Sequence, residues 1–292
     1  MNYATSQIRN IIDGVYDVQK LRIATGNRVV AALRPDAVVK TTEDGEEKQD
    51  DSVIRAIVNE YRRVADAYAS EFHGKGSIEK ALNGTEYIKN KMDWALVENY
   101  MRLVETEDGL TKVVDRIVKD HPMWDKFFAD VKGCGTLMAG VCLAYLDPYK
   151  ARHVSSFWKY CGLDVVMTED GKWEGRQKKH TEMRPYIDKD GNEGEKRSIT
   201  YRPMLKTKLV GVLGSSFLRA KGSHYGQVYY DYKHRLDQRE DLTPIHKHRM
   251  ATRYAVKMFL RDMWVAWREL EGLEVTEPYE VAKLGHRPHG AA

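Results

Sequence analysis

The sequence predicts a mainly α-helical protein, and three observations support this prediction. Apolar residues recur at intervals of three and four over most of the 292 residues, which is the period of an amphipathic helix. Residues 137–146 are apolar almost without interruption, as in a helix buried on all sides. Residues 164–200 instead carry Asp-Gly turn signals among charges. We therefore expect a helical body with a helix-hairpin-helix-like element and a basic β-hairpin or loop insertion.

The N-terminal third is predicted to be wholly helical. Pro35 disfavours continuation of the first helix, the acidic stretch 40–51 is expected to be an exposed loop, and "HGKGS" at 73–77 interrupts the pattern. Helices are predicted at 6–33 and 53–68, and two more at 78–82 together with 87–105 and at 110–118. We assign residues 1–120 to a helical N-terminal region and expect it to serve self-association, so that the protein is a homo-oligomer.

The remainder is assigned to a second domain at 121–272, followed by an irregular tail at 273–292. A two-glycine bend at 131–136 precedes the apolar helix. Strand-like fragments, "LDVVM" and "SITYR", flank the charged insertion. Helices are predicted at 137–146, 154–160 (closed by Gly162), 204–221, 225–239 and 246–270.

Composition restricts the class of protein. Hydrophobic residues make up 42% of the chain and charged residues 31%, as in ordinary soluble proteins. No apolar run reaches the length of a membrane span, and no signal-peptide pattern is present. The three cysteines form no C-x-x-C pair, which favours neither a disulfide framework nor a zinc site. We expect a cytoplasmic protein with no membrane partner, no bound metal and no cofactor, with Mg²⁺ required only if it is a nuclease.

Charge is distributed unevenly along the chain. Residues 172–261 hold 21 Lys and Arg against 10 Asp and Glu, whereas the rest of the sequence has an acidic excess. Such asymmetry favours a polyanion as the partner of the C-terminal part. The alternative is a solvated basic face without a partner.

The bend Gly133-Cys134-Gly135 before an apolar helix resembles the helix-hairpin-helix DNA-binding motif. Backbone amides at such a bend and at the following helix start can bind phosphate oxygens without reading bases. The predicted contacts run from Gly133 to Thr136, and Lys132 adds a positive charge beside them. The alternative is a structural turn between two core helices.

The basic insertion is the second predicted contact surface. Its cations would neutralise phosphates and make binding weaken with salt, and the aromatic residues among them could stack on unpaired bases. The alternative is a solvated hairpin whose aromatic residues pack on the body. The predicted nucleic-acid-binding residues here are Lys172, Trp173, Arg176, Lys178, Lys179, Arg197, Arg202, Lys206 and Lys208.

Catalytic and metal-binding patterns are weak. His246 and His248 would point apart at a helix start, so they do not predict a metal site. The serine pairs 155–156 and 215–216 lie in helical patterns with no marked base. A two-metal nuclease needs several converging carboxylates, and Asp17, the most suggestive N-terminal aspartate, lies in a helical pattern. The catalytic residues are left unassigned.

Four segments in the C-terminal half follow one another in an order that is typical of a known family. They are "VKGCGTLMAGVCLAYLDPYKARHVSSFWKYCGLDVV", "GKWEGRQKK", "YRPMLKTKLVGVLGSSFLRAKGSHYGQVYYDYKHR" and "HKHRMATRYAVKMFLRDMWVAW". Together they resemble the C-terminal domain of the bridge-RNA-guided insertion-sequence transposases. The resemblance spans about Asp130 to Leu270 and rests on pattern and order. It implies a nucleic-acid-binding domain.

The same resemblance implies a RuvC-like N-terminal domain with metal-binding carboxylates and a catalytic serine shortly after "GL". At the expected place of the serine, this chain has Thr168, a hindered secondary hydroxyl. Its N-terminal part lacks the strand pattern of a RuvC-like fold. The resemblance therefore implies inherited binding of nucleic acid and does not extend to strand cutting.

The leading hypothesis is a DNA-backbone-binding protein of a mobile element or phage. Three alternatives stay open. One is an active transposase- or recombinase-like nuclease that uses Thr168 or Asp17. The others are a module that binds structured RNA and a structural phage protein.

Overall fold

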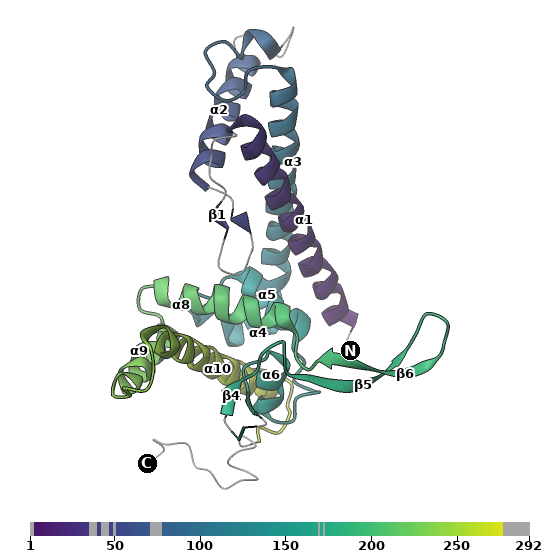
Figure 1. The fold of residues 1–292 in the computed structure, drawn as a ribbon, viewed down its shortest axis with the longest axis vertical. Helices are drawn as coiled ribbons and strands as arrows, with labels where there is room; N and C mark the ends of the chain where they lie inside the picture. The colour runs from purple at the N-terminus through teal and green to yellow at the C-terminus, as the bar shows by residue number, and fades with distance from the viewer. Residues whose placement is uncertain are drawn as a thin grey trace. The chain divides into compact units, whose positions relative to one another are not determined.

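The computed structural model describes residues 3–34, 40–41, 47–48, 51–70, 78–168, 170–171 and 173–276. The chain divides into two compact units. One comprises Asn10 to Val113, and the other combines the residues up to Arg9 with those from Val114 onward. Helices dominate both units, which confirms the predicted mainly α fold (Figure 1). The predicted domain boundary at residue 120 lies a few residues beyond the division, and the first residues of the chain lie in the later unit.

Three long helices form most of the unit from Asn10 to Val113, namely α1 (Tyr3–Leu33), α2 (Asp51–Ser70) and α3 (Lys91–Lys119), where α1 and α3 extend beyond it. The 3₁₀ turn η1 (Ile78–Lys80) precedes α3. The apolar faces pack on one another around buried residues that include Val30, Ile57, Ile88, Val97 and Tyr100. These faces are buried within the unit, and the self-association expected of them stays a prediction.

The predicted loop at 40–51 contains a small antiparallel strand pair, β1 (Lys40–Thr41) and β2 (Glu47–Lys48). Other residues of that stretch and the predicted break at 73–77 lie outside the described residues.

The prediction of separate helices at 87–105 and 110–118 is wrong, because α3 is continuous from Lys91 to Lys119. Gly109 costs a helix about 1 kcal/mol relative to alanine, and burial of residues on both sides of it, such as Val97 and Val118, outweighs this cost. The helix begins at Lys91 because the Asn90 side chain accepts hydrogen bonds from the amides of Met92 and Asp93.

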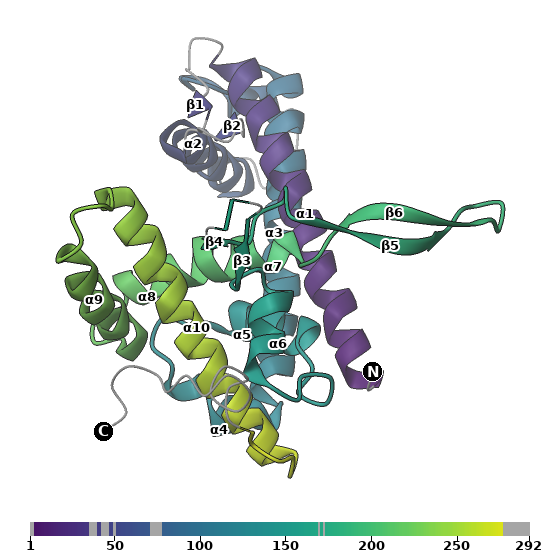
Figure 2. The same ribbon diagram turned by 60° about the horizontal axis from the view of Figure 1, so that its bottom comes forward.

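The later unit packs short helices around one long helix, α10 (Pro244–Leu270). Figure 2 shows α9 (His224–Asp237) beside α10, and α4 (Pro122–Lys126) and α6 (Val154–Tyr160) also contact α10. Helix α5 (Thr136–Tyr145) is buried from Met138 to Tyr145, as its apolar sequence predicts. Gly162 follows α6 with a φ of +68°, the left-handed conformation expected at a helix C-terminus.

The predicted helix at 204–221 is one helical run with a π-helical middle. It comprises α7 (Pro203–Lys206), η3 (Thr207–Gly214) and α8 (Ser215–Arg219). The backbone of η3 approaches α10 closely at Gly214, where an added Cβ would lie 2.6 Å from the Thr252 Cγ2 atom. Residues 273–276 are irregular, as predicted, and the tail beyond them lies outside the described residues.

The charged insertion forms two antiparallel hairpins. The first pairs β3 (Val165–Met167) with β4 (Trp173–Gly175), and the second pairs β5 (Thr181–Ile187) with β6 (Glu193–Ile199). We call residues 181–199 the arm, because both views show this hairpin extending away from the helices of its unit (Figures 1 and 2). The turn at its tip is held by the Asp188 carboxylate, which accepts hydrogen bonds from the amides of Asp190 and Asn192.

Candidate nucleic-acid interface

The two-glycine bend is closed on one side by another element of its unit. Gly133 has a φ of +95°, and a Cβ there would lie 3.1 Å from both the Ser216 carbonyl oxygen and a ring carbon of Phe217. Cys134 is buried, and its amide donates to the Val131 carbonyl. Gly135 is exposed, with open space around its Cα. The bend is thus packed at its first glycine and accessible at its second.

A carboxylate already lies at the start of α5. Asp115 forms a side-chain hydrogen bond with Thr136, the first residue of that helix, and pairs with Lys119 at 2.9 Å. The Lys119 ammonium and the Thr136 hydrogen bond hold the pKa of Asp115 below its ordinary value. Because Asp115 stays charged, it offsets the attraction of this helix start for a phosphate. Lys132 is exposed, and its carbonyl accepts a hydrogen bond from Ser223.

The element before the bend is short. It consists of the five-residue helix α4 and the 3₁₀ turn η2 (Phe128–Asp130), so the first helix of the helix-hairpin-helix-like element spans little more than two turns.

Several cations of the predicted basic segment support the hairpins from within. Arg176 is 7% exposed and pairs with the Asp164 carboxylate at 2.8 Å, while Thr200 accepts a further hydrogen bond from its guanidinium. The Lys206 ammonium donates to the Arg176 carbonyl and lies 5.3 Å from the Tyr201 ring centre. Burial lowers the pKa of Lys206 to about 8.

The other cations of the segment differ in exposure. Arg202 lies 4.2 Å over the ring of Tyr145, and its Nε atom is buried without a hydrogen-bond partner among the described residues. Lys178, Lys179 and Arg197 are exposed, and Lys179 pairs with Glu174 at 2.6 Å. Lys208 is half-buried, and Lys172 lies outside the described residues. The arm itself holds four Lys and Arg against five Asp and Glu, so the positive charge of the segment lies mainly outside it.

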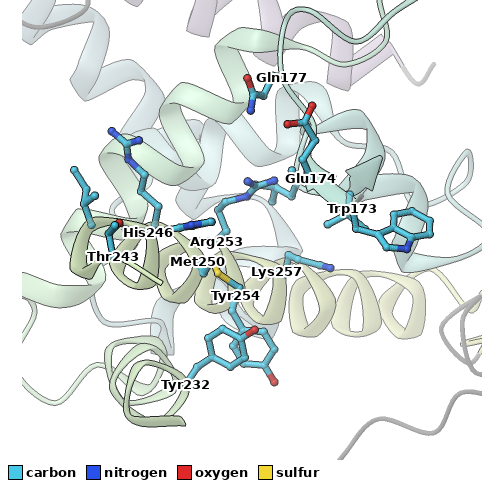
Figure 3. Close-up of a pocket in the computed structure, with 15 residues that line it drawn as sticks. Trp173, Glu174, Gln177, Tyr232, Thr243, His246, Met250, Arg253, Tyr254 and Lys257 are labelled. Atoms are coloured by element: carbon cyan, nitrogen blue, oxygen red, sulfur yellow. Dashed lines mark hydrogen bonds between the residues drawn. The ribbon is translucent and has the colours of Figure 1, made fainter. Parts of the chain in front are cut away.

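The structure contains a cationic groove that the sequence pattern did not predict. It encloses about 620 Å³ between α10 and the β3–β4 hairpin (Figure 3). Arg249, Arg253 and Lys257 line it from successive turns of α10, because residues four apart share one face of a helix. The four-residue spacing of these three cations in the sequence could have indicated a shared cationic face. The same spacing also fits the solvent-exposed face of an ordinary amphipathic helix, so it did not predict a groove.

Arg253 lies at the centre of this groove. Its guanidinium donates to the Asp164 carbonyl at 3.3 Å and lies against Gly175, which has no side chain to obstruct it. Burial lowers the pKa of Arg253, and the nearby Asp164 partly opposes this shift. Glu174 is the one carboxylate in the described lining, and it is engaged by Lys179 and His180, each at 2.6 Å.

Aromatic side chains lie along the same groove. Figure 3 shows the Trp173 ring turned outward at one end, and Trp173 is 64% exposed. Tyr232 and Tyr254 stack with ring centres 4.2 Å apart. The Lys257 ammonium lies 4.2 Å from the Trp158 ring centre, which holds its charge beside the groove. Of these residues, Trp173 was predicted to bind nucleic acid, and the structure places it beside the α10 cations.

The two weak catalytic candidates belong to different units. Thr168 follows β3 and is half-buried, whereas Asp17 is an exposed residue of α1 in the other unit. Within the described ranges, no three His, Cys, Asp or Glu side chains gather as a metal site would require. His248 binds the Tyr229 hydroxyl at 2.7 Å, and Ser215 donates to the Gly211 carbonyl.

Among the helices that the structure describes, none is both long and apolar enough to span a membrane. Comparison with protein-family models, curated proteins and solved structures finds no match for this chain.

Proposed function

We propose that the protein binds DNA mainly through the phosphate backbone, with the α10 groove as the principal contact. The observation that carries this proposal is the row of Arg249, Arg253 and Lys257 on one face of α10. Successive members of the row are about 6 Å apart along the helix axis, so a strand can run along them with a phosphate near each cation. Contacts of this kind do not depend on base sequence.

The groove favours a strand whose bases are unpaired. An exposed indole offers a stacking surface to any base, and stacking combined with a cationic track is typical of proteins that bind single strands. Trp173 lies at the end of the cation row and is free enough to serve this purpose at 64% exposure. Exposed Lys178 and Arg197, from the predicted set, provide further positive charge in the same unit.

This proposal retains the binding function implied by the likeness to a transposase C-terminal domain and omits its chemistry. A DNA-binding protein of a mobile element or phage is consistent with it. Strand cutting is not proposed, because this chain has Thr168, a hindered secondary hydroxyl, where the resemblance implies a catalytic serine, and Asp17 lies on a helix.

The test is a comparison of affinities with the full-length protein. We expect binding to a single-stranded DNA oligonucleotide to exceed binding to a duplex of the same length at equal salt. Arg249→Gln, Arg253→Gln and Lys257→Gln are each expected to weaken binding and to reduce the slope of log K against log salt by about 0.7. Arg239→Gln is the matched control, since Arg239 is already paired with Asp241 at 2.6 Å on the surface.

Two results would overturn the proposal. If all three groove variants bind as tightly as Arg239→Gln, the groove is not the contact surface. If a structured RNA outcompetes both DNA forms at the same salt concentration, the partner is RNA and the assignment to DNA is wrong.

A further inference from the structure

The arm has two features that call for a partner. A two-stranded hairpin on its own is marginally stable in water, and both strands of the arm leave one edge of backbone N–H and C=O groups unpaired within the described structure. Its apolar side chains are also exposed, at 53% for Met183, 64% for Ile187 and 37% for Ile199. Apolar side chains gathered on one surface mark interaction sites, whereas single exposed hydrophobic residues are normal.

The strand register assigns these side chains to one face. Residues directly opposite one another on paired strands lie on the same face. Met183 is opposite Arg197, Pro185 is opposite Glu195, and Ile187 is opposite Glu193. Over these three pairs the β5 strand of the face is apolar and the β6 strand is charged, and a fourth pair of the same face, Thr181 with Ile199, lies at the base of the arm. We call this face the apolar face of the arm.

The apolar face has a pattern that is complementary to itself. Counting outward from Pro185 and Glu195, two residues in one direction lead to Met183 and Arg197, and two in the other lead to Ile187 and Glu193. A two-fold axis through this midpoint exchanges the apolar residues with each other and the basic residue with the acidic one. Two-fold interfaces between identical chains require this kind of pattern.

We propose that the arm is a self-association surface, on which two copies of this chain pack their apolar faces antiparallel about a two-fold axis at Pro185 and Glu195. Met183 then lies on the partner's Ile187, and Arg197 lies opposite the partner's Glu193. The β5 strands face one another, as do the β6 strands.

Charge along the arm favours the antiparallel arrangement. The tip carries Asp188, Asp190 and Glu193 against Lys189 and is net acidic, whereas the inner part carries Arg184, Lys196 and Arg197 against Glu182 and is net basic. An antiparallel pair places each acidic tip beside a basic base, and a parallel pair would place like charges together, which is destabilising.

The interface is small, and its expected strength follows from its size. A strand of seven residues is about 23 Å long, so the arm alone buries less than the roughly 800 Å² per partner of a typical stable complex. We expect a weak dimer that forms with rising protein concentration. No arm residue lines the α10 groove, so this inference does not depend on the proposed DNA binding.

The principal test uses charge reversal at the two ends of the apolar face. In sedimentation equilibrium at increasing concentration, we expect Arg197→Glu to reduce dimer formation at least tenfold, and Glu193→Arg to do the same. The double variant carrying both changes restores both ion pairs across a two-fold axis and is expected to recover the dimer. Arg184→Glu, on the opposite face of the same strands, is the control: it lowers the basic charge of the arm but breaks no ion pair across the axis, so it should weaken the dimer far less than Arg197→Glu.

A second test places a cysteine on the axis. Facing sheets lie about 10 Å apart, a distance that a short bismaleimide can bridge. Pro185→Cys is expected to crosslink to a dimer, whereas Tyr186→Cys, on the opposite face, is not. The native cysteines do not interfere, because all three are buried and burial raises their pKa.

The proposal fails if the protein is monomeric at all concentrations, or if Arg197→Glu and Arg184→Glu weaken association equally. It also fails if the double variant does not recover the dimer, or if the two cysteine variants crosslink equally. Loss of DNA binding in the groove variants would leave all of these measurements unaffected.

Discussion

The guanidinium of Arg253 on α10 occupies the place where a side chain of residue 175 on β4 would lie. Position 175 is glycine, so the two elements approach closely enough for the arginine to lie between them. This contact joins the β3–β4 hairpin to α10 and fixes the central cation of the groove.

Gly175→Ala is therefore expected to displace Arg253 while leaving the fold intact, because the obstructing atoms are the mobile end of a long side chain. We expect weaker DNA binding, close to that of Arg253→Gln, with little change in unfolding free energy. Fluorescence anisotropy and urea unfolding measure the two effects. Gly194→Ala is the control, since a Cβ at that strand position would have no atom of another part of the chain within 4 Å. Equal binding by both glycine variants would contradict the role given to Arg253.

Trp173→Ala is expected to weaken binding of single-stranded DNA and to affect duplex binding far less. Loss of one stacked base costs about 1–3 kcal/mol, and the exposed indole has little role in the core to lose. Trp173→Phe retains an aromatic face and should recover part of the affinity. Titration with a short oligothymidine and its duplex, at one salt concentration, provides the measurement. An identical loss on both substrates would argue against stacking.

The two glycines of the bend are expected to differ in their tolerance of substitution. Gly133→Ala introduces a side chain at a φ of +95° and against the Ser216 carbonyl, and such strain costs about 1–3 kcal/mol. Gly135→Ala meets open space at an ordinary φ of −75°, and we expect a change within about 0.5 kcal/mol because reduced chain entropy offsets the poorer helix cap. Chemical denaturation of both variants compares these costs.

The bend also makes a prediction about binding. Lys132 is exposed beside it, whereas Asp115 already occupies the adjacent helix start. Lys132→Glu is expected to weaken DNA binding, but less than Arg253→Gln does. The competing carboxylate can be tested with Asp115→Asn, which should strengthen binding if phosphate approaches the bend and leave it unchanged otherwise.

The pH dependence of stability should reveal Lys206. Its pKa in the folded state is lowered to about 8, from an ordinary value of 10.5, mainly by burial. Between these two values the unfolded chain binds more protons than the folded chain, so this residue makes stability rise with pH in that window. We expect the unfolding free energy of the wild type, relative to Lys206→Met, to be higher at pH 9.5 than at pH 7.5. A constant difference would mean that Lys206 titrates normally.

The sequence pattern predicted the positions of most helices but not where one element ends and the next begins. Apolar periodicity located α1, α2, α5 and α10 within a few residues. The continuity of α3 across Gly109 could not be predicted from the sequence, because the pair Asp108-Gly109 is also typical of a turn. The charged insertion was recognised as β-hairpin or loop, but its division into two hairpins depends on contacts such as Arg176 with Asp164, twelve residues earlier in the chain.

The candidate site was harder to predict for a physical reason. A residue pattern shows which side chains are charged and does not show which of them are already paired. Arg176 and Lys206 belong to the predicted set, yet the fold uses them inside the unit. Arg249 and Arg253 lie outside that set and face the groove, because their position depends on where the β3–β4 hairpin packs against α10.

The contacts of the first turns of α1 determine the order in which the two units can fold during synthesis. Arg9 donates to the Ala144 carbonyl, 135 residues further along, and its guanidinium lies 4.8 Å over the Tyr145 ring. During synthesis the first turns of α1 therefore cannot form these contacts until α5 has left the ribosome. The unit of residues 10–113 is complete before that point, because none of its residues lies later in the chain. We expect this intervening unit to acquire structure during translation, and the unit that contains both Arg9 and α10 to be completed last.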